Sequence, residues 1–216
     1  MSDTDAQAGG GPGDAPATKQ AVYDTAVRLF ARNGFAATGM RELSREAGVN
    51  LASVNYFYGS KKGLLKAIIE DYFQDVFAVM TESLAGDDSP DVKLRRGIAA
   101  AARNFAANTD KLIIALTELP HDDPEITEFK AQRFKRISGL VQGGLGDAAA
   151  HVPVGVLGPA MVALAASRFL FLPILQQALP PDSSALSAER YPDTIAELFI
   201  NGFNGLLANN PGGQNA

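Results

Sequence analysis

The sequence predicts an all-α protein of about nine helices, arranged as two helical domains. Apolar residues recur three or four positions apart along most of the chain, which is the spacing of one helix face. Runs that contain glycine, proline or asparagine separate these periodic stretches, and no stretch alternates apolar and polar residues as a half-buried strand does. With 216 residues, of which 46% are hydrophobic and 20% charged, the chain is long enough to bury a sizeable core.

Composition also excludes several classes of protein. Cysteine is absent, so disulfide frameworks and thiol chemistry are excluded. The N-terminus shows no basic segment followed by an apolar one, as a signal peptide would, and we expect a cytoplasmic protein. Residues 1–17 are rich in Gly, Pro, Ala and Asp and are expected to be a disordered tail.

The first helix is expected to begin with Thr18 as its cap. Its core face carries apolar side chains with helical spacing, at Val22, Ala26, Leu29 and Phe30. Asn33-Gly34 is a typical helix end. Thr38 or its neighbour is then expected to cap the second helix.

The stretch Met40–Lys61 predicts two short helices joined by a glycine turn. Leu43 lies on the apolar face of the first helix, and Gly48 supplies the positive φ that ends it. Asn50 is a good cap for the second helix, Leu51–Tyr58, which buries Val54. This spacing is typical of a helix-turn-helix unit, whose second helix enters the DNA major groove.

Charge is divided unevenly along the chain. Residues 18–66 carry eight Lys or Arg against three Asp or Glu, a net charge of +5, whereas the whole chain carries −5. A polyanion would therefore be attracted to the N-terminal region and repelled by the remainder.

A long fourth helix follows, capped by Ser60 and running to about Leu84. It is apolar over a wide arc, so it is expected to contact both domains and to link them mechanically. We place the domain boundary near Tyr72, which gives a first domain at 18–72 and a second at 73–208. Residues 209–216 are expected to be a frayed tail.

Five further helices are expected in the second domain. The fifth begins at Ser89 or Pro90, and a short sixth covers 110–119. Asp123-Pro124 begins the seventh, which glycines 143, 144 and 146 end. The eighth, 152–179, is apolar enough to suggest a membrane span, but Arg168 and Pro173 favour a helix buried between protein surfaces. The ninth covers 191–207.

Residues from Thr18 to about Tyr72 resemble the DNA-binding domain of the TetR family of bacterial transcription regulators. The resemblance rests on RLFARNGFAAT, on the spacing of Arg41, Leu43, Ala47, Gly48 and Val49, and on SVNYFYGSK followed by KKGLLKAI. It covers about a quarter of the chain and is specific as a set. It implies a regulator, most often a repressor, that binds a palindromic operator in double-stranded DNA and is not an enzyme.

Residue by residue, the resemblance implies that five side chains face the groove: Arg41, Leu51, Ala52, Ser53 and Asn55. It implies phosphate contacts for Thr38, Tyr56 and Lys61. Two positions depart from the family pattern. Phe57-Tyr58 stands where many members have His-Phe, so a common phosphate donor is missing, and Gly63 stands where an acid often completes a capping box with Ser60.

One copy of so small a domain should bind DNA weakly, so we expect a homodimer formed through the helices at 152–179 and 191–207. The alternative is that these helices only complete the core of a monomer. The resemblance also implies release by a small apolar or amphipathic effector, with no cofactor. The apolar candidates for its pocket are Phe105, Leu116, Phe129 and Met161, although such residues more often belong to the core. Arg133 and Arg168 could meet an anionic group of the effector or, equally, form a salt bridge across the dimer.

The sequence leaves two alternatives to a DNA-binding regulator. A helical adaptor that binds another protein remains the main alternative. An all-α enzyme is disfavoured because no catalytic set can be assembled, and His121-Asp122-Asp123 is more simply a loop with a capping aspartate than a metal site.

Overall fold

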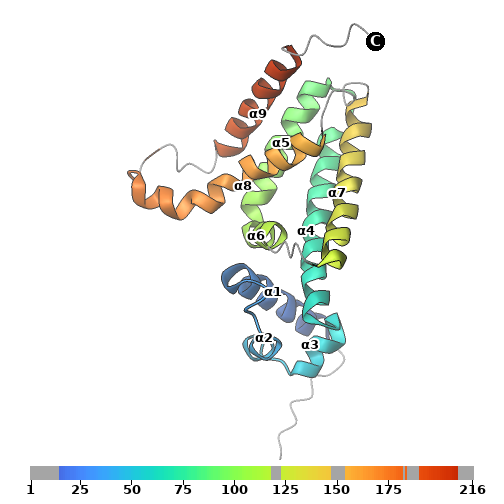
Figure 1. The fold of residues 1–216 in the computed structure, drawn as a ribbon, viewed down its shortest axis with the longest axis vertical. Coiled ribbons are helices and arrows are strands. Elements are labelled where there is room, and N and C mark those ends of the chain that lie inside the picture. Colours follow the sequence, from blue (N-terminus) through green and yellow to red (C-terminus); the bar gives the residue numbers. More distant parts are fainter. Residues whose placement is uncertain (1–14, 118–122, 147–153, 182, 184–189, 209–216) are drawn as a thin grey trace, which may run out of the picture. The chain divides into compact units, whose positions relative to one another are not determined.

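The computed structural model describes residues 15–117, 123–146, 154–181, 183 and 190–208. Within these ranges the regular elements are helices and no strand occurs, which confirms the all-α prediction (Figure 1). The helices are α1 (Ala15–Asn33), α2 (Met40–Glu46), α3 (Leu51–Tyr58), α4 (Lys61–Leu84), α5 (Pro90–Ala107), α6 (Thr109–Thr117), α7 (Pro124–Leu145), α8 (Val154–Ala178) and α9 (Tyr191–Ala208).

The chain forms two compact units. The first contains the described residues within 1–70 and 113–118, and the second contains those within 71–112 and 119–216. The chain therefore passes from the first unit to the second inside α4.

The first unit is built on α1, α2, α3 and the start of α4. Its helices bury apolar side chains at less than 2% exposure: Val22, Ala26, Leu29, Phe30, Leu43, Val54, Leu64, Leu65, Ile68 and Ile69. The prediction that Thr18 caps α1 is wrong, because the helix begins three residues earlier, at Ala15. Pro16 in its first turn needs no backbone N–H partner there, so the helix extends without strain.

Helix α4 begins as the sequence predicts. The Ser60 hydroxyl accepts the backbone N–H of Gly63 at 3.0 Å, which satisfies one of the unpaired donors of the first turn. A Cβ at position 63 would overlap the carbonyl oxygen of Tyr58. The acid that the family pattern suggested at Gly63 therefore cannot be accommodated in this backbone.

The second unit contains a core formed by α5, α8 and α9. Ile98 and Ala99 of α5 pack with Ile195 and Phe199 of α9, and two weak ion pairs, Arg95–Glu197 at 3.8 Å and Arg103–Asp193 at 3.7 Å, accompany this contact. The ninth helix therefore uses part of its apolar surface within the chain.

Helix α7 lies alongside the part of α4 that belongs to the second unit (Figure 1). Its N-cap is Asp123, whose carboxylate accepts the N–H groups of Glu125 and Ile126. The prediction that three glycines end α7 is wrong. Gly143 and Gly144 lie inside the helix, and only Gly146, with φ +56°, ends it. Gly144 instead permits close packing, since a Cβ there would lie 2.8 Å from Cβ of Leu84.

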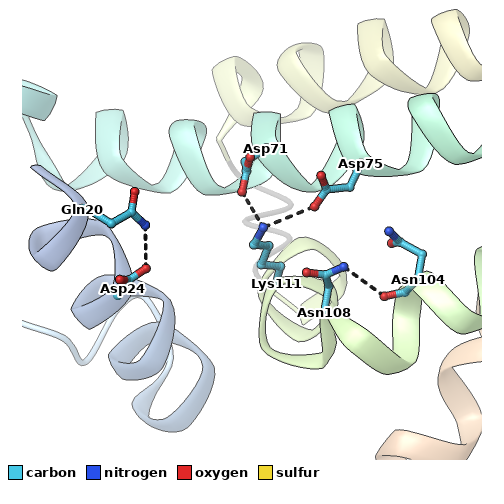
Figure 2. Close-up of polar contacts among 7 residues, drawn as sticks. All are labelled: Gln20, Asp24, Asp71, Asp75, Asn104, Asn108 and Lys111. Carbon is cyan, nitrogen blue, oxygen red and sulfur yellow. Dashed lines mark hydrogen bonds and ion pairs between the residues drawn. The ribbon is translucent and has the colours of Figure 1, made fainter. Parts of the chain in front are cut away.

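A polar contact within the second unit joins α4 to α6. The ammonium of Lys111 lies 2.5 Å from Asp71 and 3.3 Å from Asp75 (Figure 2). Burial lowers the pKa of Lys111, but hydrogen bonds and attraction from both aspartates outweigh it, and the net shift is upward. The ammonium form is thereby stabilised, and it offsets the repulsion between two carboxylates one helical turn apart.

Helix α8 runs through Pro159 and Pro173 to Ala178, so Pro173 does not interrupt it. Its surface is less buried than the sequence predicted: Leu170, Phe171 and Ile174 are 53%, 55% and 61% exposed. Among the described residues, no helix combines the length and hydrophobicity that crossing a lipid bilayer requires.

Candidate nucleic-acid interface

Helices α2 and α3 form the predicted helix-turn-helix unit. Gly48 has φ +67° at the end of α2, a conformation that glycine adopts without a steric penalty. The Asn50 side chain accepts the N–H of Ser53 at 2.7 Å and so caps α3. The backbone N–H of Gly39 donates to the Glu42 carboxylate at 3.4 Å at the start of α2. Local hydrogen bonds therefore define where both helices begin.

Helix α3 is amphipathic. Val54 is fully buried, whereas Ala52 and Asn55 are exposed and Tyr56 is 84% exposed. Arg41, in the first turn of α2, is exposed as well. These four side chains are available to a partner.

Leu51 and Ser53 are only partly exposed. The Ser53 hydroxyl donates to the Asn50 side chain at 3.0 Å, so its hydrogen is used in the cap while its oxygen lone pairs can still accept. Ser53 therefore has less hydrogen-bonding capacity left for DNA than its side chain would have if it made no contact within the chain.

Thr38 has a different environment from the one the resemblance implied. The residue is 1% exposed, and its hydroxyl donates to the carbonyl of Gly34 at 2.9 Å, with Leu29 O at 3.4 Å. In this conformation its hydroxyl offers no surface to a phosphate. Its visible role is to tie the loop between α1 and α2 to the end of α1.

Lys61 is also engaged within the first unit. Its ammonium lies 2.8 Å from Phe35 O, 3.0 Å from Thr38 O and 3.3 Å from Ala36 O. An ammonium has three hydrogens to donate, and three acceptors surround this one. The sequence pattern alone did not reveal these contacts because they join residues more than twenty positions apart.

Tyr58 explains one departure from the family pattern. Its hydroxyl donates to the backbone carbonyl of Lys19 in α1 at 3.0 Å, and partial burial raises the pKa of the phenol, with a further contribution from Asp24. A phenylalanine could not make this hydrogen bond. The tyrosine therefore joins the end of α3 to the start of α1.

An ion pair also joins α1 to α2. The guanidinium of Arg28 donates to the Glu46 carboxylate at 2.7 Å. The hydrogen bond to Arg28 lowers the pKa of Glu46, helped by the positive charges of Arg28, Arg45 and Arg32. Sequence spacing gave no signal for this pair, because the two residues lie on different helices.

The candidate effector residues are spread over several helices. Phe105 is buried and stacks on Tyr72 with centroids 6.1 Å apart. Leu116 and Phe129 are partly buried, and the side chain of Met161 lies outside the described residues. The pocket assignment therefore stays a prediction.

Both candidate arginines lie against aromatic rings. Arg133 is 3.3 Å from the centroid of Phe129, and its guanidinium donates to the Phe129 carbonyl at 2.8 Å. Arg168 is 7% exposed and lies 5.4 Å from the ring of Tyr191. Cation–π contacts thus help hold both side chains in apolar surroundings.

The predicted loop of His121 and Asp122 lies outside the described residues. Within the described part of the chain, no group of three His, Cys, Asp or Glu side chains is placed to hold a metal ion.

Comparison with known proteins covers the same part of the chain. Residues 22–68 match the sequence model of the family described as "Bacterial regulatory proteins, tetR family". An uncharacterized HTH-type transcriptional regulator of Bacillus subtilis, YerO, is 32% identical over 120 residues, which are 54% of this chain and 40% of that protein. The regulator BetI of Agrobacterium fabrum is 30% identical over 79 residues, covering 37% of this chain and 38% of that one. The chain thus matches about two fifths of the length of these relatives.

Solved structures share the fold over most of the chain. The TetR family regulator PfmR of Thermus thermophilus is 21% identical with a TM-score of 0.57, covering 83% of this chain and 97% of that one. FadR of Bacillus subtilis, solved in complex with stearoyl-CoA, is 15% identical with a TM-score of 0.66, covering 85% and 98%. These likenesses support the all-helical fold of both units.

Proposed function

We propose that this chain is a transcription regulator of the TetR family and not an enzyme. In this proposal it binds a palindromic DNA operator as a homodimer and represses transcription until a small effector releases it. The exposed face of α3 together with Arg41 carries the DNA part of the proposal. A protein with this role would act in the cytoplasm, where the chromosome is.

Each exposed side chain of this face suits a component of duplex DNA. Asn55 can pair with the edge of adenine, and Ala52, with Leu51 beside it, can contact a thymine methyl group. Arg41 can donate two hydrogen bonds to guanine or bind a phosphate, and the Tyr56 hydroxyl can donate to a phosphate. The net charge of +5 over residues 18–66 favours approach to a polyanion.

The homodimer is supported by exposed apolar side chains on two helices of the second unit. Leu170, Phe171 and Ile174 of α8 and Leu198 of α9 are each more than half exposed. Burying them against a second copy would remove apolar area from water. It would also relate the two helix-turn-helix units of the dimer by a two-fold axis.

An amphipathic effector is favoured by the residues of the second unit. Phe105 supplies apolar surface, and Arg133 and Arg168 supply positive charge next to aromatic rings. The stearoyl-CoA bound to FadR, which has a similar fold, is a molecule of this kind, so long-chain acyl-CoA is the first class to test. An effector can shift the equilibrium only by its different affinity for the two states.

The decisive experiment measures binding to DNA from upstream of the protein's own coding region, with Arg41→Ala, Asn55→Ala and Tyr56→Ala variants. Removing a base or phosphate contact should weaken binding by about tenfold or more per variant. Arg103→Ala is the matched control, because Arg103 is an exposed arginine of the second unit, and it should bind like the wild type.

The salt dependence of binding distinguishes the regulator from a protein-binding adaptor. Affinity for DNA should fall steeply with salt concentration, because each phosphate contact releases counterions. Unchanged binding in all three variants would contradict the proposed interface. Wild-type protein that binds no duplex from its own locus would favour the adaptor.

Effector release is tested by adding acyl-CoA of several chain lengths, with free CoA as the control for the headgroup. Release by the long-chain compounds alone would support an amphipathic effector. Equal operator affinity with every compound tested would contradict this part of the proposal.

A further inference from the structure

Lys61 occupies an unusual position for a lysine that the family pattern places on the DNA backbone. It is the first residue of α4, three residues after α3 ends. Its ammonium is surrounded by the carbonyl oxygens of Phe35, Ala36 and Thr38 at 2.8–3.3 Å. All three carbonyls belong to the loop that leads into α2.

The ring of Phe35 completes this environment. The ammonium lies 4.4 Å from the ring centroid, within the range of a cation–π contact. Phe35 is held in turn by an edge-on contact with the buried Phe30, at 5.3 Å. The lysine is therefore attached to the core of the first unit and not only to a surface loop.

The loop is fixed on two sides. Thr38 donates through its hydroxyl to Gly34 O and Leu29 O, while Lys61 donates to loop carbonyls. Carbonyls in such a loop lack the partners that a helix would supply, and the Lys61 ammonium is an internal donor for three of them. Gly39, the N-cap of α2, follows this doubly held segment directly.

The contacts of Lys61 therefore connect the start of α4, which follows α3, to the loop that precedes α2. Arg41 lies in the first turn of α2, two residues beyond the N-cap, and Asn55 and Tyr56 lie on α3. Any movement of the loop relative to α4 would change the distance between Arg41 and the α3 side chains.

We propose that Lys61 is a positioning residue: it clamps the loop before α2 to the start of α4, and thereby sets the spacing between Arg41 and the reading face of α3. This inference rests on the proposed DNA-binding function. It assigns Lys61 an internal role in place of the phosphate contact that the resemblance implied. A phosphate contact would require the ammonium to leave three carbonyls, each of which would lose a charged donor.

The test compares Lys61→Met and Lys61→Arg with Lys62→Met, which removes the same charge one position along. Operator affinity is measured over a range of salt concentrations, in the wild-type and in the Arg41→Ala background. Circular dichroism establishes that each variant is folded. Amide hydrogen exchange at Thr38 and Leu43 reports on the loop and on the start of α2, because their N–H groups donate to Gly34 O and Gly39 O.

Lys61→Met is expected to weaken operator binding about tenfold, and most of this loss should disappear when Arg41 is already alanine. Lys61→Arg should behave like Lys61→Met, because a planar guanidinium cannot direct three hydrogens at converging carbonyls as an ammonium does. Exchange of the Thr38 and Leu43 amides should be faster in both variants and unchanged in Lys62→Met.

Three results would overturn the proposal. Wild-type affinity in Lys61→Arg, together with a salt slope that is smaller by about 0.9 in Lys61→Met in both backgrounds, would make Lys61 a phosphate ligand. A lower melting temperature with unchanged operator affinity would make it purely structural. If the wild type binds no DNA, the proposed function fails on its own. Unchanged exchange of the Thr38 and Leu43 amides in Lys61→Met would refute the clamp separately.

Discussion

Large apolar side chains are exposed to different extents in the two compact units. In the first unit the exposed example among the described residues is Tyr56, which carries a hydroxyl. Among the described side chains of the second unit the exposed set is Val92, Phe134, Leu170, Phe171, Ile174 and Leu198. The first unit thus offers polar and positively charged groups to a partner, and the second offers apolar area.

This difference is consistent with the two kinds of recognition proposed for the chain, DNA binding by the first unit and self-association by the second. Polar groups that read DNA must be positioned accurately, and the first unit holds its loops with charged and capping hydrogen bonds such as those of Lys61 and Asn50. Apolar association is less directional, and it scales with the area removed from water. The following predictions test this contrast, from the largest expected effect to the smallest.

The same truncation should have different consequences in the two units. Leu43 is fully buried in the first unit, and Leu170 is 53% exposed in the second. Leu43→Ala should lower the free energy of unfolding by about 2–5 kcal/mol, because it removes packed methyl groups and leaves a cavity. Leu170→Ala should change it by less than about 0.5 kcal/mol but weaken self-association. Urea denaturation and sedimentation equilibrium measure the two effects. A stable Leu43→Ala variant, or unchanged self-association of Leu170→Ala, would contradict the contrast.

Two helical glycines should respond in opposite directions to alanine. A Cβ at Gly63 would overlap the Tyr58 carbonyl, whereas a Cβ at Gly139, inside α7, meets nothing within 4 Å. Gly63→Ala should therefore destabilise the protein by about 1–3 kcal/mol. Gly139→Ala should stabilise it by about 0.4–1 kcal/mol, because the unfolded chain loses freedom. Thermal unfolding of the two variants measures both signs, and equal shifts would show that the close approach at Gly63 is unimportant.

The smallest effect concerns pH. The hydrogen bond from Arg28 lowers the pKa of Glu46 in the folded state, so the pair stabilises the first unit above the unfolded pKa of about 4.3. This contribution is lost as pH falls through the lower folded value. As the pH falls below 5, Glu46→Gln should therefore lose less stability than the wild type. The difference should be small, as expected of an exposed ion pair. Melting temperatures across this range, with Glu82→Gln as the control, would show it. An identical pH profile for Glu46→Gln and the wild type would refute the prediction.

The helix-turn-helix unit was predictable because its signals are local. Gly48 and Asn50 mark the end of α2 and the cap of α3 through contacts within four residues of themselves. The predicted second helix, Leu51–Tyr58, agrees with the structure at both ends. The exposure of Asn55 and the burial of Val54 follow from the same helical period.

The sequence misled where long-range contacts decide. Thr38 and Lys61 fit a phosphate-binding pattern, yet both have partners inside the first unit. Gly143 and Gly144 suggested a helix end, but close packing against Leu84 accounts for Gly144 within the helix. In α9, Ile195 and Phe199 pack on α5 while Leu198 remains exposed, and the sequence did not distinguish these apolar residues.

By itself the sequence determined the helical class, the bounds of α3 and the concentration of positive charge near the N-terminus. Each of these depends on residue type and on spacing along one helix, which is short-range information. Tertiary structure alone decided which donors are free. The ammonium of Lys61 meets carbonyls more than twenty residues away, and the hydroxyl of Tyr58 meets α1. Such partners come together only after the helices pack, because hydrogen bonding depends on distance and angle in space and not on separation along the chain.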